Sequence, residues 1–134
     1  MEAFDARTLV CLKGTTDLYN PKVVRCSMGA VVRGGLQFLV AEDAAALCRQ
    51  LRGYRIFAAT LAGPGAVVEA ADLAEHLTGK DAFVFGNEAR GVSREVLDMS
   101  DFQLRIPIAS HVDSLNVGVA VGVVLHAAAT SRST

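Results

Sequence analysis

The sequence predicts an α/β fold in which a parallel β-sheet carries helices on both faces. Strand-like apolar runs alternate with helix-like segments along the whole chain, with no internal repeat or linker. The apolar residues are mostly Val, Ala, Leu and Ile, aromatic residues make up only 6% of the chain, and there is no Trp. At 134 residues the chain fits a single domain with a substantial core.

Residues 6–12 predict the first strand, expected to be buried, because residues 8–11 form an unbroken β-favouring run. Asn20 and Pro21 indicate the start of a helix, because Asn can cap a helix and Pro suits its first position. This helix is expected to continue to about residue 30 or 32. Residues 36–40 predict the second strand.

Residues 42–51 predict the next helix, which Gly53 would stop. The residues expected on its inner side are Ala45, Leu47, Cys48 and Leu51. Residues 54–60 predict a third strand, and the Gly- and Pro-containing residues 60–65 predict a loop at its end.

The C-terminal half continues the alternation. Residues 70–77 are expected to form a short helix or turn, and residues 82–85 a short, fully apolar strand. Ser93 is expected to cap a helix of one or two turns that ends near residue 97. Residues 102–106 predict the last strand, and residues 114–129 the last helix.

Charge and hydropathy exclude some classes of protein. The formal net charge is −1, so the chain is not a strongly basic nucleic-acid binder, and a surface for RNA would have to be local. The longest apolar run, residues 117–129, is far shorter than the ~20 residues of a membrane span. No membrane association is therefore expected.

The cysteine and histidine patterns indicate a reduced environment and no metal site. The three cysteines show no CxxC spacing and are expected to be small buried side chains: Cys11, Cys26 and Cys48. With no signal peptide in the sequence, this pattern favours a cytoplasmic protein. The histidines lack a second ligand four residues away: His76, His111 and His126.

Two short patterns carry most of the functional information. The first is Phe-Val-Phe-Gly-Asn-Glu-Ala-Arg-Gly-Val-Ser at residues 83–93. The second is Ile-Pro-Ile at residues 106–108, followed by Ser-Leu-Asn-Val-Gly-Val-Ala at residues 114–120. Each joins an apolar strand to a polar turn, and such turns gather at the carboxyl edge of a parallel sheet, where α/β proteins bind ligands. No GxGxxG motif comes after a strand, which disfavours an ordinary dinucleotide site.

These patterns resemble the second and third signature motifs of the SpoU/TrmH-type RNA 2′-O-ribose methyltransferases, which belong to the SPOUT superfamily. Residues 17–30 are similar to a helix in the middle of that family's catalytic domain, and Thr60, which closes a strand before a glycine loop, also matches. The resemblance covers nearly the whole chain. It implies that residues 1–134 are a SPOUT-type methyltransferase catalytic domain.

The resemblance implies a deep trefoil knot in the C-terminal part, which holds S-adenosylmethionine. Three loops are expected to enclose the cofactor, with main-chain groups near Ile106 and Ile108 at the adenine edge. The cofactor-binding residues it implies are Thr60, Leu61, Gly63, Gly86, Asn87, Glu88, Ile106, Pro107, Ile108, Ser114, Leu115 and Asn116.

The resemblance also implies that Glu88, Ser114 and Asn116 act at the methyl donor and the target ribose. Each has a structural alternative. Glu88 could be a carboxylate favoured by a helix dipole, and Ser114 and Asn116 could be ordinary helix caps. Gly86 could be a plain turn glycine, and Pro107 could only end its strand.

RNA and a second copy of the chain are the expected partners. The residues expected to contact RNA phosphates are Lys22, Arg25, Arg33 and Arg90. For Arg25 the alternative is a solvated helix face. Small residues on the last helix suit close packing, either within a knot or across the homodimer interface that the family has: Gly118, Ala120, Gly122, Ala127 and Ala128.

The family's first motif, Asn-x-Gly-x-x-x-Arg, is missing, and its Arg assists the reacting hydroxyl. The opening Ala-Phe-Asp-Ala at residues 3–6 resembles the family's residues immediately C-terminal to that Arg. The domain is therefore expected to be N-terminally incomplete: a truncated chain, a natural fragment that needs a partner, or a remnant without activity.

The sequence supports three functional hypotheses. The first is methyl transfer from S-adenosylmethionine to a ribose 2′-hydroxyl of tRNA or rRNA, with catalysis impaired in this chain alone. The second is a non-catalytic S-adenosylmethionine-binding or dimerisation module. The third is an unrelated small α/β ligand-binding protein with an unknotted sheet.

Overall fold

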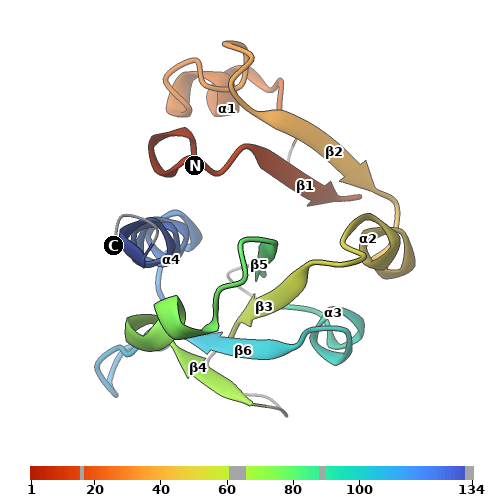
Figure 1. Cartoon of the computed structure of the whole chain (residues 1–134). Coiled ribbons are helices and arrows are strands. Elements are labelled where there is room, and N and C mark those ends of the chain that lie inside the picture. The colour runs from red at the N-terminus through yellow and green to blue at the C-terminus, as the bar shows by residue number, and fades with distance from the viewer. Residues whose placement is uncertain (16, 61–65, 88–89, 132–134) are drawn as a thin grey trace. The chain divides into compact units, whose positions relative to one another are not determined.

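The computed structural model describes residues 1–15, 17–60, 66–87 and 90–131 (Figure 1). The chain forms two compact units, Met1–Gln50 (the N-terminal unit) and Leu51–Thr134 (the C-terminal unit). The elements of the N-terminal unit are η1 (Glu2–Phe4), β1 (Thr8–Leu12), α1 (Pro21–Cys26), β2 (Gln37–Ala41) and α2 (Ala44–Gln50). Those of the C-terminal unit are β3 (Arg55–Ala59), β4 (Val67–Glu69), η2 (Ala70–His76), β5 (Asp81–Phe85), α3 (Arg94–Asp98), β6 (Phe102–Arg105) and α4 (Val117–Ser131).

The N-terminal unit contains a two-stranded parallel sheet. Strand β1 pairs with β2 from Thr8 opposite Gln37 to Leu12 opposite Ala41. Helix α2 packs against both strands. The predicted strands at residues 6–12 and 36–40 are therefore present within two residues of their expected bounds.

Helix α1 begins as predicted but ends early. The Asn20 side-chain oxygen accepts a hydrogen bond of 2.9 Å from the Lys22 N–H, and Pro21 is the first helical residue. The helix ends at Cys26 rather than near residue 30 or 32, because Met28 and Gly29 adopt φ of +51° and +80°. That left-handed backbone cannot continue an α-helix, and for Met it is an uncommon conformation.

The expected inner side of α2 is wrong in two positions. Leu47 is buried and Leu51 is half-buried, but Ala45 and Cys48 are exposed. Residues 44, 47 and 51 share the packed face, because they follow the spacing of three and four residues along a helix. The prediction of three buried cysteines is likewise wrong, since Cys11 is buried whereas Cys26 and Cys48 are exposed.

The C-terminal unit contains a four-stranded parallel sheet in the order β4-β6-β3-β5. The strands predicted at residues 54–60, 82–85 and 102–106 are β3, β5 and β6. Strand β4 was not predicted from the sequence. The parallel pairing that was expected within one sheet is thus divided between two separate sheets.

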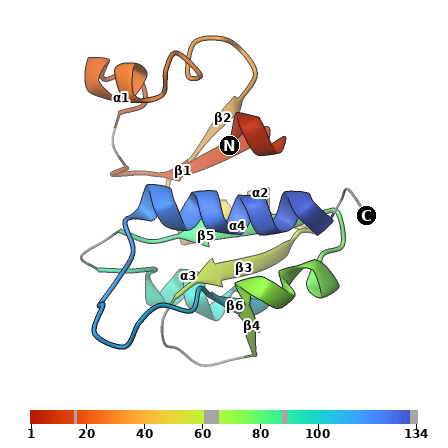
Figure 2. The same ribbon diagram turned by 90° about the vertical axis from the view of Figure 1, so that its left-hand side faces the viewer.

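Helices cover both faces of the four-stranded sheet. Helices α4 and η2 lie on one face, and α3 lies on the other (Figures 1 and 2). On the α4 side, Phe57 stacks on Phe102 with ring centroids 5.3 Å apart. The buried core cluster on this side comprises Phe57, Val68, Ala70, Leu73, Leu104, Val124 and Ala128.

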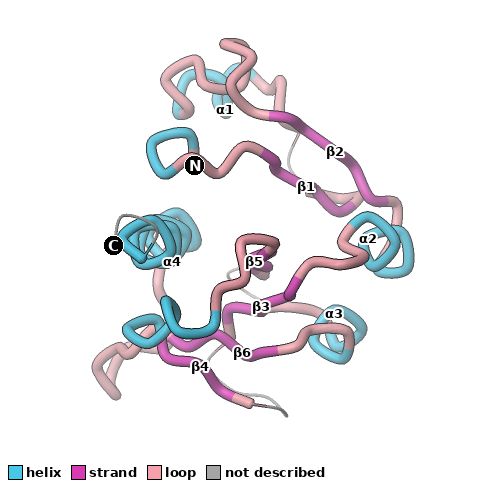
Figure 3. Tube along the Cα trace, in the orientation of Figure 1, coloured by secondary structure: helices cyan, strands magenta, loops and turns pink. Residues whose placement is uncertain are grey.

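A long irregular segment, residues 106–116, connects β6 to α4 (Figure 3). It begins at the carboxyl end of a central strand, so it can approach the ends of the neighbouring strands. Within the described ranges, no helix is both long enough and apolar enough to cross a bilayer.

Candidate functional site

A cavity of about 320 Å³ lies at the carboxyl ends of β3, β5 and β6. Its volume falls within the range of about 300–1,000 Å³ that is usual for small-molecule sites. The lining residues that the structure describes all belong to the C-terminal unit. They are Ala59, Thr60, Phe85, Gly86, Asn87, Gly91, Val92, Leu104, Ile106, Ile108, Asp113, Ser114, Leu115, Val117 and Ala120.

The first wall comes from the end of β3. The Thr60 N–H donates a hydrogen bond of 3.2 Å to the Leu104 carbonyl, which extends the β3–β6 pairing by one residue. This bond fixes Thr60 at the carboxyl end of β3, where the residue lines the cavity.

The second wall is the turn after β5. Asn87 and Gly91 form an isolated antiparallel bridge, with N–H···O distances of 3.2 Å and 2.7 Å in the two directions. A Cβ on Gly86 would lie 2.0 Å from the Gly91 carbonyl carbon, so this bridge requires glycine at residue 86. Gly91 has a φ of +66°, which glycine adopts without strain. The geometry of the turn thus accounts for both glycines.

The third wall is the irregular segment after β6. Ile106, Ile108 and Leu115 supply apolar surface, and Ser114 supplies a hydroxyl. Asp113 also lines the cavity, and it is the single charged side chain among the described lining residues. Asp113 was not predicted as a site residue, although its position directly before Ser114 in the second pattern could have suggested it.

Asn116 lies outside the lining of this cavity. Its side-chain oxygen accepts hydrogen bonds from the N–H groups of Gly118, at 2.9 Å, and Val119, at 3.4 Å. Asn116 therefore caps α4, which begins at Val117 rather than at residue 114 as predicted. The predicted cap at Ser93 does precede α3, but the Ser93 side chain makes no capping hydrogen bond.

Pro107 also lies outside this lining. It borders a second cavity of about 290 Å³, together with Glu69, Arg105, Ile106 and Ile108. The turn at residues 106–108 therefore borders both cavities, with Ile106 and Ile108 common to the two.

The structure brings most of the predicted cofactor residues together. Those that line the first cavity are Thr60, Gly86, Asn87, Ile106, Ile108, Ser114 and Leu115. Leu61, Gly63 and Glu88 lie outside the described residues. The lining residues that were not predicted as cofactor contacts are Ala59, Phe85, Gly91, Val92, Leu104, Asp113, Val117 and Ala120.

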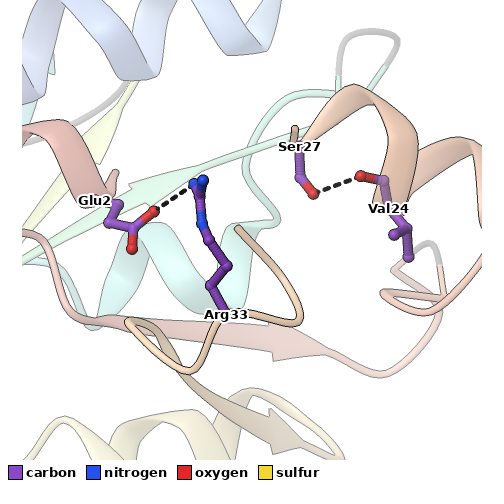
Figure 4. Close-up of polar contacts among 4 residues, drawn as sticks. All are labelled: Glu2, Val24, Ser27 and Arg33. Carbon is purple, nitrogen blue, oxygen red and sulfur yellow. Dashed lines mark hydrogen bonds and ion pairs between the residues drawn. The ribbon is translucent and has the colours of Figure 1, made fainter. Parts of the chain in front are cut away.

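The residues expected to contact RNA are exposed, but their surroundings differ. Lys22, Arg25 and Arg33 belong to the N-terminal unit, and Arg90 to the C-terminal unit. Figure 4 shows Arg33 directed at Glu2, with 3.0 Å between Nη2 and Oε2. This ion pair offsets the charge of Arg33.

Figure 4 also shows how the segment before Arg33 is fixed. The Ser27 hydroxyl donates a hydrogen bond of 2.8 Å to the Val24 carbonyl at the end of α1. Gly35 then passes Glu2 so closely that a Cβ at residue 35 would lie 2.3 Å from Glu2 Oε1. These contacts orient Arg33 within the N-terminal unit.

A family model and a curated relative both match most of this chain. The model of the SpoU rRNA Methylase family matches residues 1–126. The 23S rRNA (guanosine-2′-O-)-methyltransferase RlmB of Xylella fastidiosa strain Temecula1 is 36% identical over 114 residues, which are 85% of this chain and 44% of that protein. The chain thus spans about half the length of this relative.

Solved structures of methyltransferases also match nearly the whole chain. An AdoMet-bound rRNA methyltransferase of Sinorhizobium meliloti matches 95% of this chain and 47% of its own, with a TM-score of 0.83 and 27% identity. The methyltransferase AviRb of Streptomyces viridochromogenes, in complex with AdoMet, matches 98% of this chain and 52% of its own, with a TM-score of 0.80 and 25% identity.

Proposed function

Since the chain belongs to the SpoU rRNA Methylase family, we propose that it binds S-adenosylmethionine and supplies the methyl-donor half of an RNA-methylating active site. The proposed reaction is transfer of the methyl group to a ribose 2′-hydroxyl of tRNA or rRNA. The main support is the 320 Å³ cavity, which collects residues of both sequence patterns at the ends of β3, β5 and β6.

The lining of the cavity fits this cofactor. Apolar side chains such as Leu104, Ile106 and Ile108 can pack against the faces of an adenine ring. Thr60, Asn87 and the turn between residues 106 and 108 bring polar groups to the cavity, beside the edges of a bound ligand. The Asp113 carboxylate suits a ligand that carries positive charge.

When bound, S-adenosylmethionine would supply a methyl group on a sulfonium, from which a neutral thioether departs readily. The protein must therefore position the ribose and help to remove the hydroxyl proton. Ser114 has its hydroxyl at the cavity, and we assign Glu88 to the same site by its place in the first pattern. Asn116 supports the site by fixing the start of α4 directly after Ser114 and Leu115.

Removal of the ribose 2′-hydroxyl proton is the step that distinguishes an active enzyme from a cofactor-binding module. Slow methyl transfer by this chain alone is part of the proposal, and the transfer assay below measures it. The alternative is an S-adenosylmethionine-binding module without methyl-transfer activity.

The trefoil knot, the homodimer and a cytoplasmic location belong to the same proposal. The long segment at residues 106–116 is where a knotted crossing would fit. On α4, Val119 and Val123 are exposed, and His126 and Thr130 are the polar residues of this otherwise apolar helix between Val117 and Thr130. An all-round apolar helix is usually buried, which supports a packing partner such as a second copy.

Isothermal titration calorimetry with S-adenosylmethionine tests the cofactor proposal. We expect saturable binding that Ile108→Asp abolishes and Val112→Asp, in the same segment but outside the cavity, leaves intact. Absence of binding at millimolar cofactor would contradict the proposal.

Methyl transfer from labelled cofactor to bulk tRNA and rRNA then distinguishes the enzyme from the inactive module. Ser114→Ala should lower any transfer by a larger factor than it lowers cofactor affinity. Ser110→Ala is the matched control, because Ser110 lies in the same segment and does not line the cavity. Binding without transfer, both alone and with added cell extract, would favour the module.

A further inference from the structure

The second cavity offers a site that the proposed reaction does not use. It has a volume of about 290 Å³ and is bordered by Glu69, Arg105 and the turn at residues 106–108. Ile106 and Ile108 also line the cofactor cavity, so the two cavities share one turn. A ligand in the second cavity would thus lie next to the proposed cofactor.

Arg105 is held in a defined orientation at this cavity. Glu69 on β4 lies directly opposite Arg105 on β6 in the parallel register. The Arg105 Nε donates a hydrogen bond of 2.6 Å to Glu69 Oε1, and Nη2 donates to the same oxygen. These bonds raise the pKa of the Arg105 guanidinium above its ordinary value, so the side chain stays charged.

One edge of the guanidinium remains available. Its Nε and Nη2 edge faces Glu69, whereas Nη1 makes no hydrogen bond with any residue in the described ranges. The Arg105 side chain is 51% exposed. The edge formed by Nη1 and the second N–H of Nη2 can therefore reach a ligand. Two parallel N–H donors in a fixed plane suit a ligand with two adjacent acceptors.

The neighbouring carboxylate selects among such ligands. Glu69 offsets the charge of Arg105, and its own negative charge disfavours a phosphate at short range. A neutral pair of acceptors escapes this repulsion. The O6 and N7 atoms of guanine are such a pair, and Arg bonded to both is the commonest specific contact to a base.

The rest of the cavity suits a planar base. Ile106, Pro107 and Ile108 provide apolar surface beside the guanidinium, against which the face of a base can pack. Bases in single-stranded or looped RNA expose both their faces and their edges, so they can enter a site of this shape.

We propose that the second cavity binds a guanine base of the RNA substrate, with Arg105, held by Glu69, bonded to O6 and N7. This inference rests on the proposed function, because it assumes an RNA substrate. It makes Arg105 a specificity-determining residue and Glu69 the residue that positions it.

Binding of short RNAs to the full chain tests the proposal. The probes are a uridine hexamer, the same hexamer with one internal guanosine, and a third with 7-deazaguanosine, which lacks N7. Fluorescence anisotropy should show the guanosine hexamer binding roughly five- to 100-fold more tightly than the uridine hexamer, as expected for one bidentate contact. The 7-deazaguanosine hexamer should lose most of that preference.

Two variants test whether Arg105 and Glu69 are responsible for the preference for guanosine. Arg105→Lys keeps the charge and can keep the pair with Glu69, but it lacks the planar fork, so the preference should fall to about onefold. Glu69→Ala frees Arg105 from its partner, so affinity for both hexamers should rise while the preference falls. Arg94→Lys is the matched control, because Arg94 forms a comparable surface pair with Asp98 at 2.9 Å and should change nothing.

Several results would overturn the inference. Equal binding of the guanosine and uridine hexamers, or no binding of either at millimolar concentration, would exclude guanine recognition by this chain. An Arg105→Lys variant that weakens both hexamers equally would indicate a phosphate contact instead. Calorimetry on the same samples separates this failure from that of the proposed function, since S-adenosylmethionine binding is measured without RNA and neither Glu69 nor Arg105 lines the cofactor cavity.

Discussion

Gly86 approaches Gly91 so closely that a Cβ on Gly86 would lie 2.0 Å from the Gly91 carbonyl carbon and 2.3 Å from its oxygen. This approach closes the turn after β5 through the bridge between Asn87 and Gly91. The turn forms one wall of the proposed cofactor site, so its shape and the affinity for the cofactor should change together.

Gly86→Ala should therefore weaken both folding and cofactor binding. Because the clash is with backbone, the turn must shift, and a cost of about 1–3 kcal/mol in unfolding free energy is expected. Cofactor affinity should fall by more than tenfold. Urea denaturation and calorimetry measure the two effects. Gly122→Ala is the control, since a Cβ there meets nothing within 4 Å and Ala favours a helix.

Substitutions at Asn116 should separate its capping role from any role in catalysis. Asn116→Ala removes the acceptor for the Gly118 N–H and should lower the unfolding free energy by about 1 kcal/mol. Asn116→Asp keeps an acceptor at the cap and should retain stability. If Asn116→Asp also retains methyl transfer, the side chain serves only as a cap. Loss of transfer with full stability would indicate a direct role.

Asp113→Asn should alter cofactor selectivity. The carboxylate is the charged group among the described lining residues, and a sulfonium is cationic whereas the product thioether is neutral. Affinity for S-adenosylmethionine should fall roughly two- to fivefold, as expected for an exposed charge pair, with a smaller loss for S-adenosylhomocysteine. Competition calorimetry with both ligands checks this. An equal loss for both would mean that Asp113 lies away from the sulfur.

The thiols should differ in reactivity. Cys26 and Cys48 are exposed and should react quickly with a chromogenic disulfide, whereas Cys11 is buried and should react only after unfolding. Burial also raises the pKa of the Cys11 thiol. Prompt reaction of all three thiols in the native protein would contradict the burial of Cys11.

The Cys11 pKa has a consequence for stability at alkaline pH. Well below about pH 8.5 the thiol is neutral in both the folded and the unfolded chain, so it has no pH effect there. Above that pH the unfolded chain ionises first, and the unfolding free energy should fall as pH rises. Denaturation of Cys11→Ala should show a shallower alkaline fall than the unmodified protein.

Local signals explain which elements could be predicted from the sequence. The cap at Asn20 and the strand at residues 102–106 depend on a few neighbouring residues, and both are present. The two patterns also met at one cavity as expected, because parallel strands end at the same edge of a sheet.

Non-local and conformational effects explain which elements could not be predicted. Strand β4 has only three residues, and its place at the sheet edge depends on pairing with β6, far along the chain. Helix α1 ends early because Met28 has a positive φ. A methionine in the sequence does not indicate such a backbone conformation. The opposition of Glu69 and Arg105 likewise comes from strand register, which is why Arg105 was not among the predicted RNA contacts.

The shared turn at residues 106–108 gives the two cavities a physical route for coupling. If a ligand on one side shifts Ile106 or Ile108, it changes the free energy of binding on the other side. Such coupling is reciprocal: the factor by which the cofactor changes RNA affinity must equal the factor by which RNA changes cofactor affinity. A turn of three residues would then make the protein respond to the simultaneous presence of the methyl donor, which is the cofactor, and the methyl acceptor, which is the RNA.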